Sequence, residues 1–164
     1  VGRSLDQYGE YSEAESDLFE QVVRPGSVVV EAGAYIGVHT LLLSQRAGDQ
    51  GWVYAFEPQR PIYEMLCANL ALNGRRNVRC RCEALGDAAG EIWVPPMNYD
   101  AEANFGGLGL GSYQSGEKVP VATIAAKSVL LVVCFAFLLG ALDQFIHLLR
   151  WQPRAGEAED TGVS

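Results

Sequence analysis

Two carboxylates and a short glycine turn are spaced in this chain as a nucleotide-binding site requires. Glu31 comes just ahead of Gly33, and Gly37 closes the turn. Glycine at such a turn lets the backbone approach a ligand without a Cβ in the way. Glu57 lies about 20 residues beyond Gly37, where a doubly wound fold places a carboxylate against a ribose diol. A carboxylate suits that task because it can accept hydrogen bonds from two hydroxyl groups.

The residues of the turn distinguish between two classes of nucleotide cofactor. A dinucleotide-binding turn follows the pattern G-x-G-x-x-G, but Tyr35 stands where the middle glycine would admit a pyrophosphate. Glu31 would also repel a pyrophosphate, and it would attract an ammonium or a sulfonium group. S-adenosylmethionine carries both of these cations. It is therefore the predicted cofactor, and NAD is the weaker alternative.

Hydrophobic patterning predicts the elements that position these residues. Three consecutive valines, Val28–Val30, predict a short buried strand that ends at the turn. Apolar residues at helical spacing after Gly37 predict a helix that closes near Arg46. Alternation over Trp52–Phe56 predicts a second strand, which ends at Glu57. This order is typical of an α/β fold with a doubly wound, mostly parallel sheet, in which ligands bind outside the carboxyl ends of the strands.

The residues before this unit predict one helix. Ser12 and Glu15 have the spacing of a capping box ahead of an apolar stripe, which predicts a helix over 13–23. The preceding segment Tyr8–Tyr11 is a candidate wall of the ligand site.

The residues after the second strand predict further elements. Residues 61–73 have apolar residues at helical intervals and end at Gly74, a helix stop. Residues 77–83 alternate, with cysteines on one face and arginines on the other, which predicts an edge strand. The arginines are expected to serve solubility and to block edge pairing. Residues 91–94 predict a short strand, and 97–117 are expected to form a loop over the acceptor side of the site.

Composition narrows the classes of partner. The chain has 164 residues, of which 49% are hydrophobic, as expected for one globular domain. Twelve basic against 20 acidic residues give a net charge of −8, which argues against nucleic acid or an anionic membrane as the main partner. A small molecule is the expected partner. The four cysteines, with no signal-peptide pattern ahead of them, favour a cytoplasmic location, and Cys80 and Cys82 lack the spacing of a metal site.

Three ordered motifs resemble those of the FkbM family of S-adenosylmethionine-dependent methyltransferases. They are Glu31–Gly37 (EAGAYIG), Ala55–Pro58 (AFEP) and Asn69–Gly74 (NLALNG), and the later stretches Ala84–Asp87 and Asn104–Gly107 also resemble the family. The resemblance implies a Rossmann-like class I methyltransferase fold in which the third strand is the sheet edge. It also implies methyl transfer, most often to a hydroxyl oxygen on a small molecule or sugar.

The resemblance further implies where the methyl donor binds. Glu31, Gly33 and Gly37 would line the methionine end, Glu57 would hold the ribose, and the stretch around Glu83 would meet the adenine. The remaining residues of the turn complete the set of expected cofactor-binding residues, which is Glu31, Gly33, Ala34, Tyr35, Gly37, Glu57 and Glu83.

The resemblance ends near Ile124. The family would place an acidic residue next and then a strand with two carboxylates facing the active site, but this chain has Ala125 and the uncharged run Val129–Leu142. A buried strand or core helix is expected for that run, and a membrane span over 122–142 is the alternative. Without those carboxylates the catalytic base is unknown, and His39 is expected to pack against the sheet. The alternative function is a donor-binding remnant with weak or no catalysis.

Four segments are expected along the chain. They are an N-terminal helical segment (1–26), an FkbM-like methyltransferase domain (27–124), a hydrophobic segment with an amphipathic helix (125–150) and a disordered tail (151–164). The fold is therefore expected to be incomplete at its C-terminal end.

Overall fold

The main sheet of the molecule has four parallel strands. The structure, a computed structural model, describes residues 2–8, 11–101, 104–110, 112–124 and 130–133. The strand order is β3-β2-β1-β7, and every neighbouring pair is parallel. The strands are β1 (Val28–Ala32), β2 (Trp52–Phe56), β3 (Val78–Arg81) and β7 (Leu130–Val133).

The strand order reverses at β1. The chain runs outward from β1 through β2 to β3, and β7 then returns to the other side of β1. Glu31 pairs with Ala55 of β2 on one side and with Val132 of β7 on the other. Ligands of open α/β sheets bind at the carboxyl ends of the strands beside such a reversal. The predicted Rossmann-like sheet is thus confirmed, with β3 as its edge.

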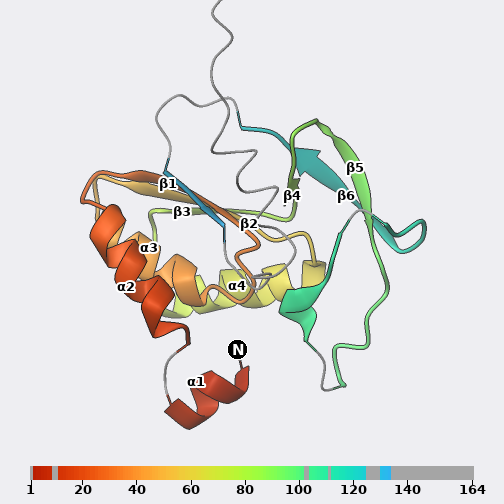
Figure 1. Cartoon of the computed structure of the whole chain (residues 1–164), viewed down its shortest axis with the longest axis horizontal. Helices are drawn as coiled ribbons and strands as arrows, with labels where there is room; N and C mark the ends of the chain where they lie inside the picture. Colours follow the sequence, from red (N-terminus) through yellow and green to blue (C-terminus); the bar gives the residue numbers. More distant parts are fainter. Residues whose placement is uncertain (1, 9–10, 102–103, 111, 125–129, 134–164) are drawn as a thin grey trace, which may run out of the picture. The chain divides into compact units, whose positions relative to one another are not determined.

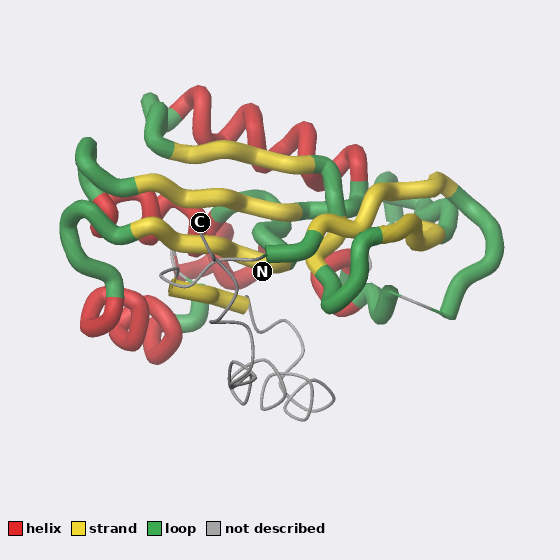
Figure 2. Tube along the Cα trace, turned by 90° about the horizontal axis from the view of Figure 1, so that it is seen from above, coloured by secondary structure: helices red, strands yellow, loops and turns green. Residues whose placement is uncertain are grey.

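Three helices lie on one face of the main sheet (Figure 1, Figure 2). They are α2 (Glu13–Val22), α3 (Val38–Ala47) and α4 (Arg60–Leu72). Their apolar sides form two core clusters with the strands: one includes Phe19, Leu43 and Val29, and the other includes Leu66 and Ala55. The described residues hold no helix on the opposite face, so the doubly wound arrangement is seen here in the strand order alone.

A second, smaller sheet lies between β3 and β7 in the chain. Its strand order is β4-β6-β5, with β4 parallel and β5 antiparallel to β6. The strands are β4 (Ala84–Leu85), β5 (Gly90–Val94) and β6 (Glu117–Ala122). A single-turn 3-10 helix, η1 (Phe105–Gly107), lies in the connection from β5 to β6 and sits beside the start of α4 (Figure 1).

The start of the chain differs from the prediction in two ways. A short helix, α1 (Gly2–Tyr8), precedes α2 and was not predicted. The prediction of a capping box is wrong, because Ser12 has a left-handed backbone (φ 57°) and its side chain makes no hydrogen bond to the start of α2. The Glu15 carboxylate instead contacts His39, 24 residues further along the chain.

The uncharged run near the end of the chain contributes a strand. Leu130–Val133 forms β7 and pairs in parallel with β1, so of the two predicted structures these residues form the strand. One continuous helix over 122–142 is excluded by that strand. Among the residues that the structure describes, no helix is long and apolar enough to cross a bilayer. The predicted amphipathic helix and tail lie outside the described residues, and the predicted segment boundaries stay predictions.

Candidate functional site

The turn after β1 folds over the end of β2. The backbone N–H groups of Gly33 and Ala34 donate to the carbonyl oxygen of Phe56 at 2.9 and 3.0 Å. Gly33 and Tyr35 both have positive φ, 72° and 51°. A bulky residue in the left-handed region is uncommon, and such strain collects at ligand-binding sites. The predicted turn is therefore a strained backbone cradle at the carboxyl ends of β1 and β2.

Two glycines of the turn are required for different reasons. A Cβ built on Gly33 meets no atom within 4 Å, so the space beside it is open. A Cβ built on Gly37 lies 2.7 Å from Cδ1 of Leu66, so a side chain there collides with α4. Gly33 thus borders open space, whereas Gly37 lets α3 begin close to α4.

Glu57 joins the turn to the start of α4. Its carboxylate accepts hydrogen bonds from the backbone N–H of Tyr35 at 3.0 Å and of Gln59 at 2.9 Å. Burial raises the pKa of Glu57, and these two N–H donors oppose the rise. The side chain is only 3% exposed. The Gln59 side chain is a third donor, and a carboxylate has about four acceptor sites, so Glu57 retains capacity for a further donor, as a ribose hydroxyl would supply.

Glu31 is fully buried beneath the turn. Its carboxylate accepts a hydrogen bond from the hydroxyl of Thr40 in α3 at 2.6 Å. Because the side chain has no exposed surface, it would act on a bound cation through its charge, without direct contact in this conformation. The prediction that Glu31 belongs to the cofactor site stays a prediction.

Glu83 lies at the end of the neighbouring strand. It follows β3, is half-buried, and its carboxylate lies 3.5 Å from the guanidinium of Arg81. The backbone N–H of Glu57 donates to the carbonyl oxygen of Arg81 at 3.0 Å, which joins the ends of β2 and β3. The predicted residues therefore lie at the carboxyl ends of three adjacent strands, with Glu83 on the β3 side.

His39 is a structural residue, but its partner differs from the one expected. Its ring lies 3.1 Å from the carboxylate of Glu15 and packs edge-on against Phe19, both in α2. Burial lowers the pKa of His39, and Glu15 opposes that change. The expectation that it packs against the sheet is wrong, because the side chain faces α2 instead.

The tyrosines ahead of α2 differ in their surroundings. The ring of Tyr11 lies 5.9 Å from the ring of His39. The pKa of Tyr35 is raised mainly by burial, then by Glu57, and Tyr11 makes a smaller contribution in the same direction. Tyr11 therefore lies near the turn. Tyr8 is 73% exposed and does not wall the site.

Sequence reasoning missed Gln59. The side chain is buried, and its amide donates to the carbonyl oxygen of Phe105 at 2.9 Å. The hydroxyl of Tyr99 lies 3.4 Å from the other end of the same amide. No local pattern in the sequence indicates these contacts, because the partners lie in the distant connection between β5 and β6.

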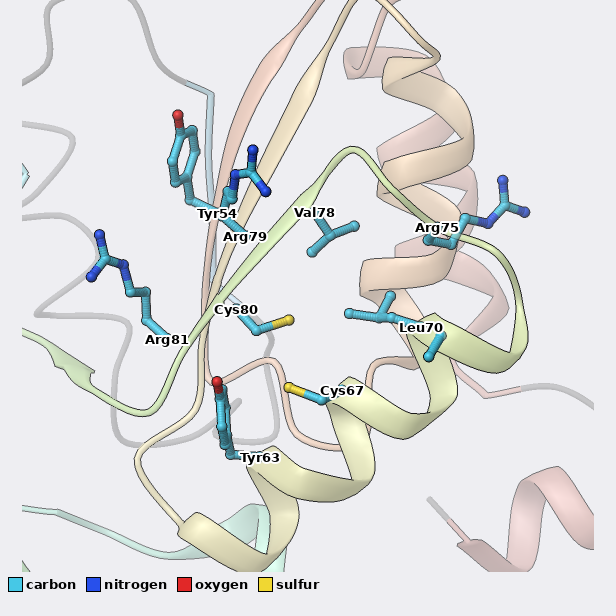
Figure 3. Close-up of a pocket in the computed structure, with 10 residues that line it drawn as sticks. Tyr54, Tyr63, Cys67, Leu70, Arg75, Val78, Arg79, Cys80 and Arg81 are labelled. Atoms are coloured by element: carbon cyan, nitrogen blue, oxygen red, sulfur yellow. The ribbon is translucent and has the colours of Figure 1, made fainter.

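A separate cavity of about 630 Å³ lies beside β3 and α4. Figure 3 shows Cys67, Leu70, Val78 and Cys80 facing one another there, while Arg79 points to the opposite side of the strand. The guanidinium of Arg79 lies 4.5 Å from the centre of a Trp52 ring. The cavity lining includes neither the glycine turn nor Glu57, so this cavity is not the predicted site.

The cysteines of that cavity do not indicate metal chemistry. Burial, followed by the neighbouring Cys67, raises the pKa of Cys80 to about 12. A thiol with such a pKa is protonated at neutral pH and is a poor metal ligand. In the part of the chain that the structure describes, no cluster of three or more metal-ligating side chains occurs.

Comparison with known proteins gives structural similarities alone. No family model matches the chain, and no curated protein matches it. The resemblance to the FkbM family therefore stays a prediction.

The solved structures that match include several S-adenosylmethionine-dependent methyltransferases. An O-methyltransferase from Thermotoga maritima is 17% identical, with 49% of this chain and 32% of that chain covered and a TM-score of 0.43. A methyltransferase from Aquifex aeolicus is 25% identical, with 46% of this chain and 38% of that chain covered and a TM-score of 0.39. An rRNA methylase from Streptococcus thermophilus is 24% identical, with 43% of this chain and 41% of that chain covered and a TM-score of 0.39.

These similarities are limited in extent. This chain spans less than half the length of each of the three matching proteins, and the TM-scores are low. The Rossmann-like assignment accordingly follows from the chain's own strand order, and any function is argued from its own residues.

Proposed function

We propose that this chain binds S-adenosylmethionine at the carboxyl ends of β1, β2 and β3 and belongs to the methyltransferases that use it. The observation that carries the proposal is the buried carboxylate of Glu57. It accepts a hydrogen bond from the strained glycine turn and can still accept one from a ribose hydroxyl. The matching structures include S-adenosylmethionine-dependent methyltransferases, which agrees with this choice of cofactor.

The residues present fit such a donor. Glu57 would accept the ribose hydroxyls, and the open space beside Gly33 would admit the methionine end. Ala34, Tyr35 and Gly37 would complete the cradle around it. Tyr35, in place of the pyrophosphate-binding glycine, disfavours a dinucleotide.

The ends of the donor would meet two further carboxylates. Glu83 would lie near the adenine, and the buried charge of Glu31 would favour the cationic end.

The reaction would be transfer of a methyl group to an acceptor, proposed to be a hydroxyl on a small molecule or sugar. The donor supplies an electrophilic methyl group, so the protein's main tasks are to align the acceptor and to exclude water. The net charge of −8 favours such an acceptor over a polyanion. An rRNA methylase is also among the matching structures, so the small acceptor is proposed for this chain from its charge and not from those structures.

A second candidate is donor binding with little or no turnover. It is favoured by β7, which lies beside β1 where the FkbM resemblance would place a strand bearing two carboxylates. The residues of β7 are Leu130, Leu131, Val132 and Val133, none of which can accept a proton. A methyl-transfer assay over a panel of hydroxylated acceptors separates the two candidates.

Titration calorimetry tests the binding proposal. We expect the chain to bind S-adenosylhomocysteine in preference to NAD. Tighter binding of NAD would contradict the cofactor assignment, because it would mean that Tyr35 leaves room for a pyrophosphate.

A further inference from the structure

Two aromatic side chains of the connection between β5 and β6 lie close to Glu57. The rings of Tyr99 and Phe105 pack against each other with their centres 4.9 Å apart, and both side chains are half-buried. Phe105 begins η1, which lies beside the first turn of α4 (Figure 1). This aromatic pair is therefore brought from a distant part of the chain to the start of the β2–β3 crossover.

Gln59 holds the pair in place. Its side-chain amide donates to the carbonyl oxygen of Phe105 at 2.9 Å, and the hydroxyl of Tyr99 lies 3.4 Å from its amide oxygen. Its backbone N–H donates to the carboxylate of Glu57 at 2.9 Å. Because the side chain is only 5% exposed, this one residue connects the aromatic pair rigidly to Glu57.

The pair lies next to Glu57, just beyond the carboxyl end of β2. Gln59 is the N-cap of α4, the helix that leads from β2 to β3, whereas the glycine turn belongs to β1. Glu57 also contributes, after burial, to the raised pKa of Tyr99, as a nearby carboxylate would. A ligand whose ribose lies on Glu57 would therefore have both the turn and the aromatic pair beside it.

We propose that Tyr99 and Phe105, positioned by Gln59, form a wall for the nucleobase of the methyl donor. The inference rests on the proposed function, since it takes the ribose to lie at Glu57. With the methionine end at the turn and the ribose on Glu57, the aromatic pair beside Glu57 is left for the nucleobase. Aromatic side chains stabilise bases by stacking on their faces.

Two ligands separate the contribution of the nucleobase from that of the rest of the donor. S-adenosylhomocysteine carries the base, and S-ribosylhomocysteine has the same ribose and amino acid without it. We expect Phe105→Ala to weaken binding of S-adenosylhomocysteine at least about fivefold and to leave S-ribosylhomocysteine unchanged. Both dissociation constants are measured by calorimetry, with competition titrations for the weaker ligand.

Two further variants test the positioning role and the specificity of the effect. Gln59→Met keeps the side-chain length and the backbone hydrogen bond to Glu57 but loses both contacts to the aromatic pair and the side-chain hydrogen bond to Glu57. Glu57 would contact the ribose of both ligands, so we expect both to weaken and S-adenosylhomocysteine to lose more affinity than S-ribosylhomocysteine. Tyr113→Ala removes a 37% exposed aromatic side chain from the same connection, and we expect neither ligand to change.

The outcomes distinguish this wall from the proposed function. If wild type binds S-adenosylhomocysteine but Phe105→Ala weakens both ligands equally or neither, the wall is refuted and donor binding stands. Equal affinity of wild type for the two ligands refutes the wall in the same way. If wild type binds no S-adenosylhomocysteine, both proposals fail.

Discussion

Replacement of Gly33 by valine should abolish donor binding without unfolding the protein. Gly33 has φ of 72°, and a Cβ there meets no protein atom within 4 Å. The cost to stability is therefore backbone strain of about 1–2 kcal/mol, with no collision at the Cβ. A small domain is stable by about 5–15 kcal/mol, so the variant should remain folded. The valine methyl groups would instead fill the open space that the ligand needs.

The chain offers a matched control for this strain. Gly48 has φ of 66°, has no atom within 4 Å of a built Cβ, and follows α3 at the end away from the turn. Gly48→Val should lose a similar amount of stability and keep full affinity. Thermal unfolding gives the stability of both variants, and calorimetry with S-adenosylhomocysteine gives their affinity.

Gly33→Val should lose all measurable affinity, and a loss of about tenfold, equivalent to 1.4 kcal/mol, is the least that the reasoning allows. Gly33→Ala adds the Cβ alone and should fall between wild type and the valine variant. The reasoning is refuted if Gly33→Val binds as wild type does, or if Gly48→Val loses as much affinity as Gly33→Val.

Three further predictions concern the supports of the site. Gly37→Ala should lower the free energy of unfolding by about 1–3 kcal/mol more than Gly48→Ala does, because its Cβ would lie 2.7 Å from Leu66. Chemical denaturation measures both values, and equal losses would contradict the packing argument. Since burial lowers the pKa of His39 in the folded state, its unfolded form gains a proton first, so stability should fall as the pH drops below 6.5 toward the lower folded pKa. His39→Gln should lack that component, and an unchanged pH profile would show that His39 does not cause it. Methyl transfer by the purified chain should be weak or absent because β7 carries no carboxylate, and robust turnover would refute this and direct the search for a base to the 99–116 connection.

The main sheet could be predicted because its determinants are local. The valine run of β1, the alternation of β2 and the glycines between them each act within a few residues, so period and turn chemistry suffice. Glu57 could be found for the same reason, since its distance from the turn is set by one helix and one strand. The apolar run that contains β7 was also visible, but its composition alone left both a strand and a helix open.

The remaining features depend on contacts between distant residues. Gln59 and Phe105 are separated by 46 positions, and nothing near either residue indicates the other. His39 was assigned to the sheet because its partner Glu15 belongs to α2, and helix-to-helix contacts are not specified by either helix alone. Glu15 was expected to cap α2, but its carboxylate serves the buried ring instead, so a tertiary contact overrides a local motif.

Binding of 2′-deoxy S-adenosylhomocysteine to wild type and to Glu57→Ala tests the central claim most directly. Glu57→Ala should lower affinity for S-adenosylhomocysteine at least about tenfold, since charge-assisted hydrogen bonds are worth about 1.5–3 kcal/mol each and water can replace part of them. Glu57→Gln should lie between the two, because it keeps one acceptor oxygen.

The comparison of the two ligands removes any effect of Glu57→Ala on the turn itself, whose Tyr35 N–H loses its partner in every complex. If Glu57 holds the ribose, loss of the 2′-hydroxyl should weaken binding to wild type but change binding to Glu57→Ala little, because the hydrogen bond is already gone. Equal losses in both proteins would show that Glu57 does not contact the ribose and would contradict the proposed site.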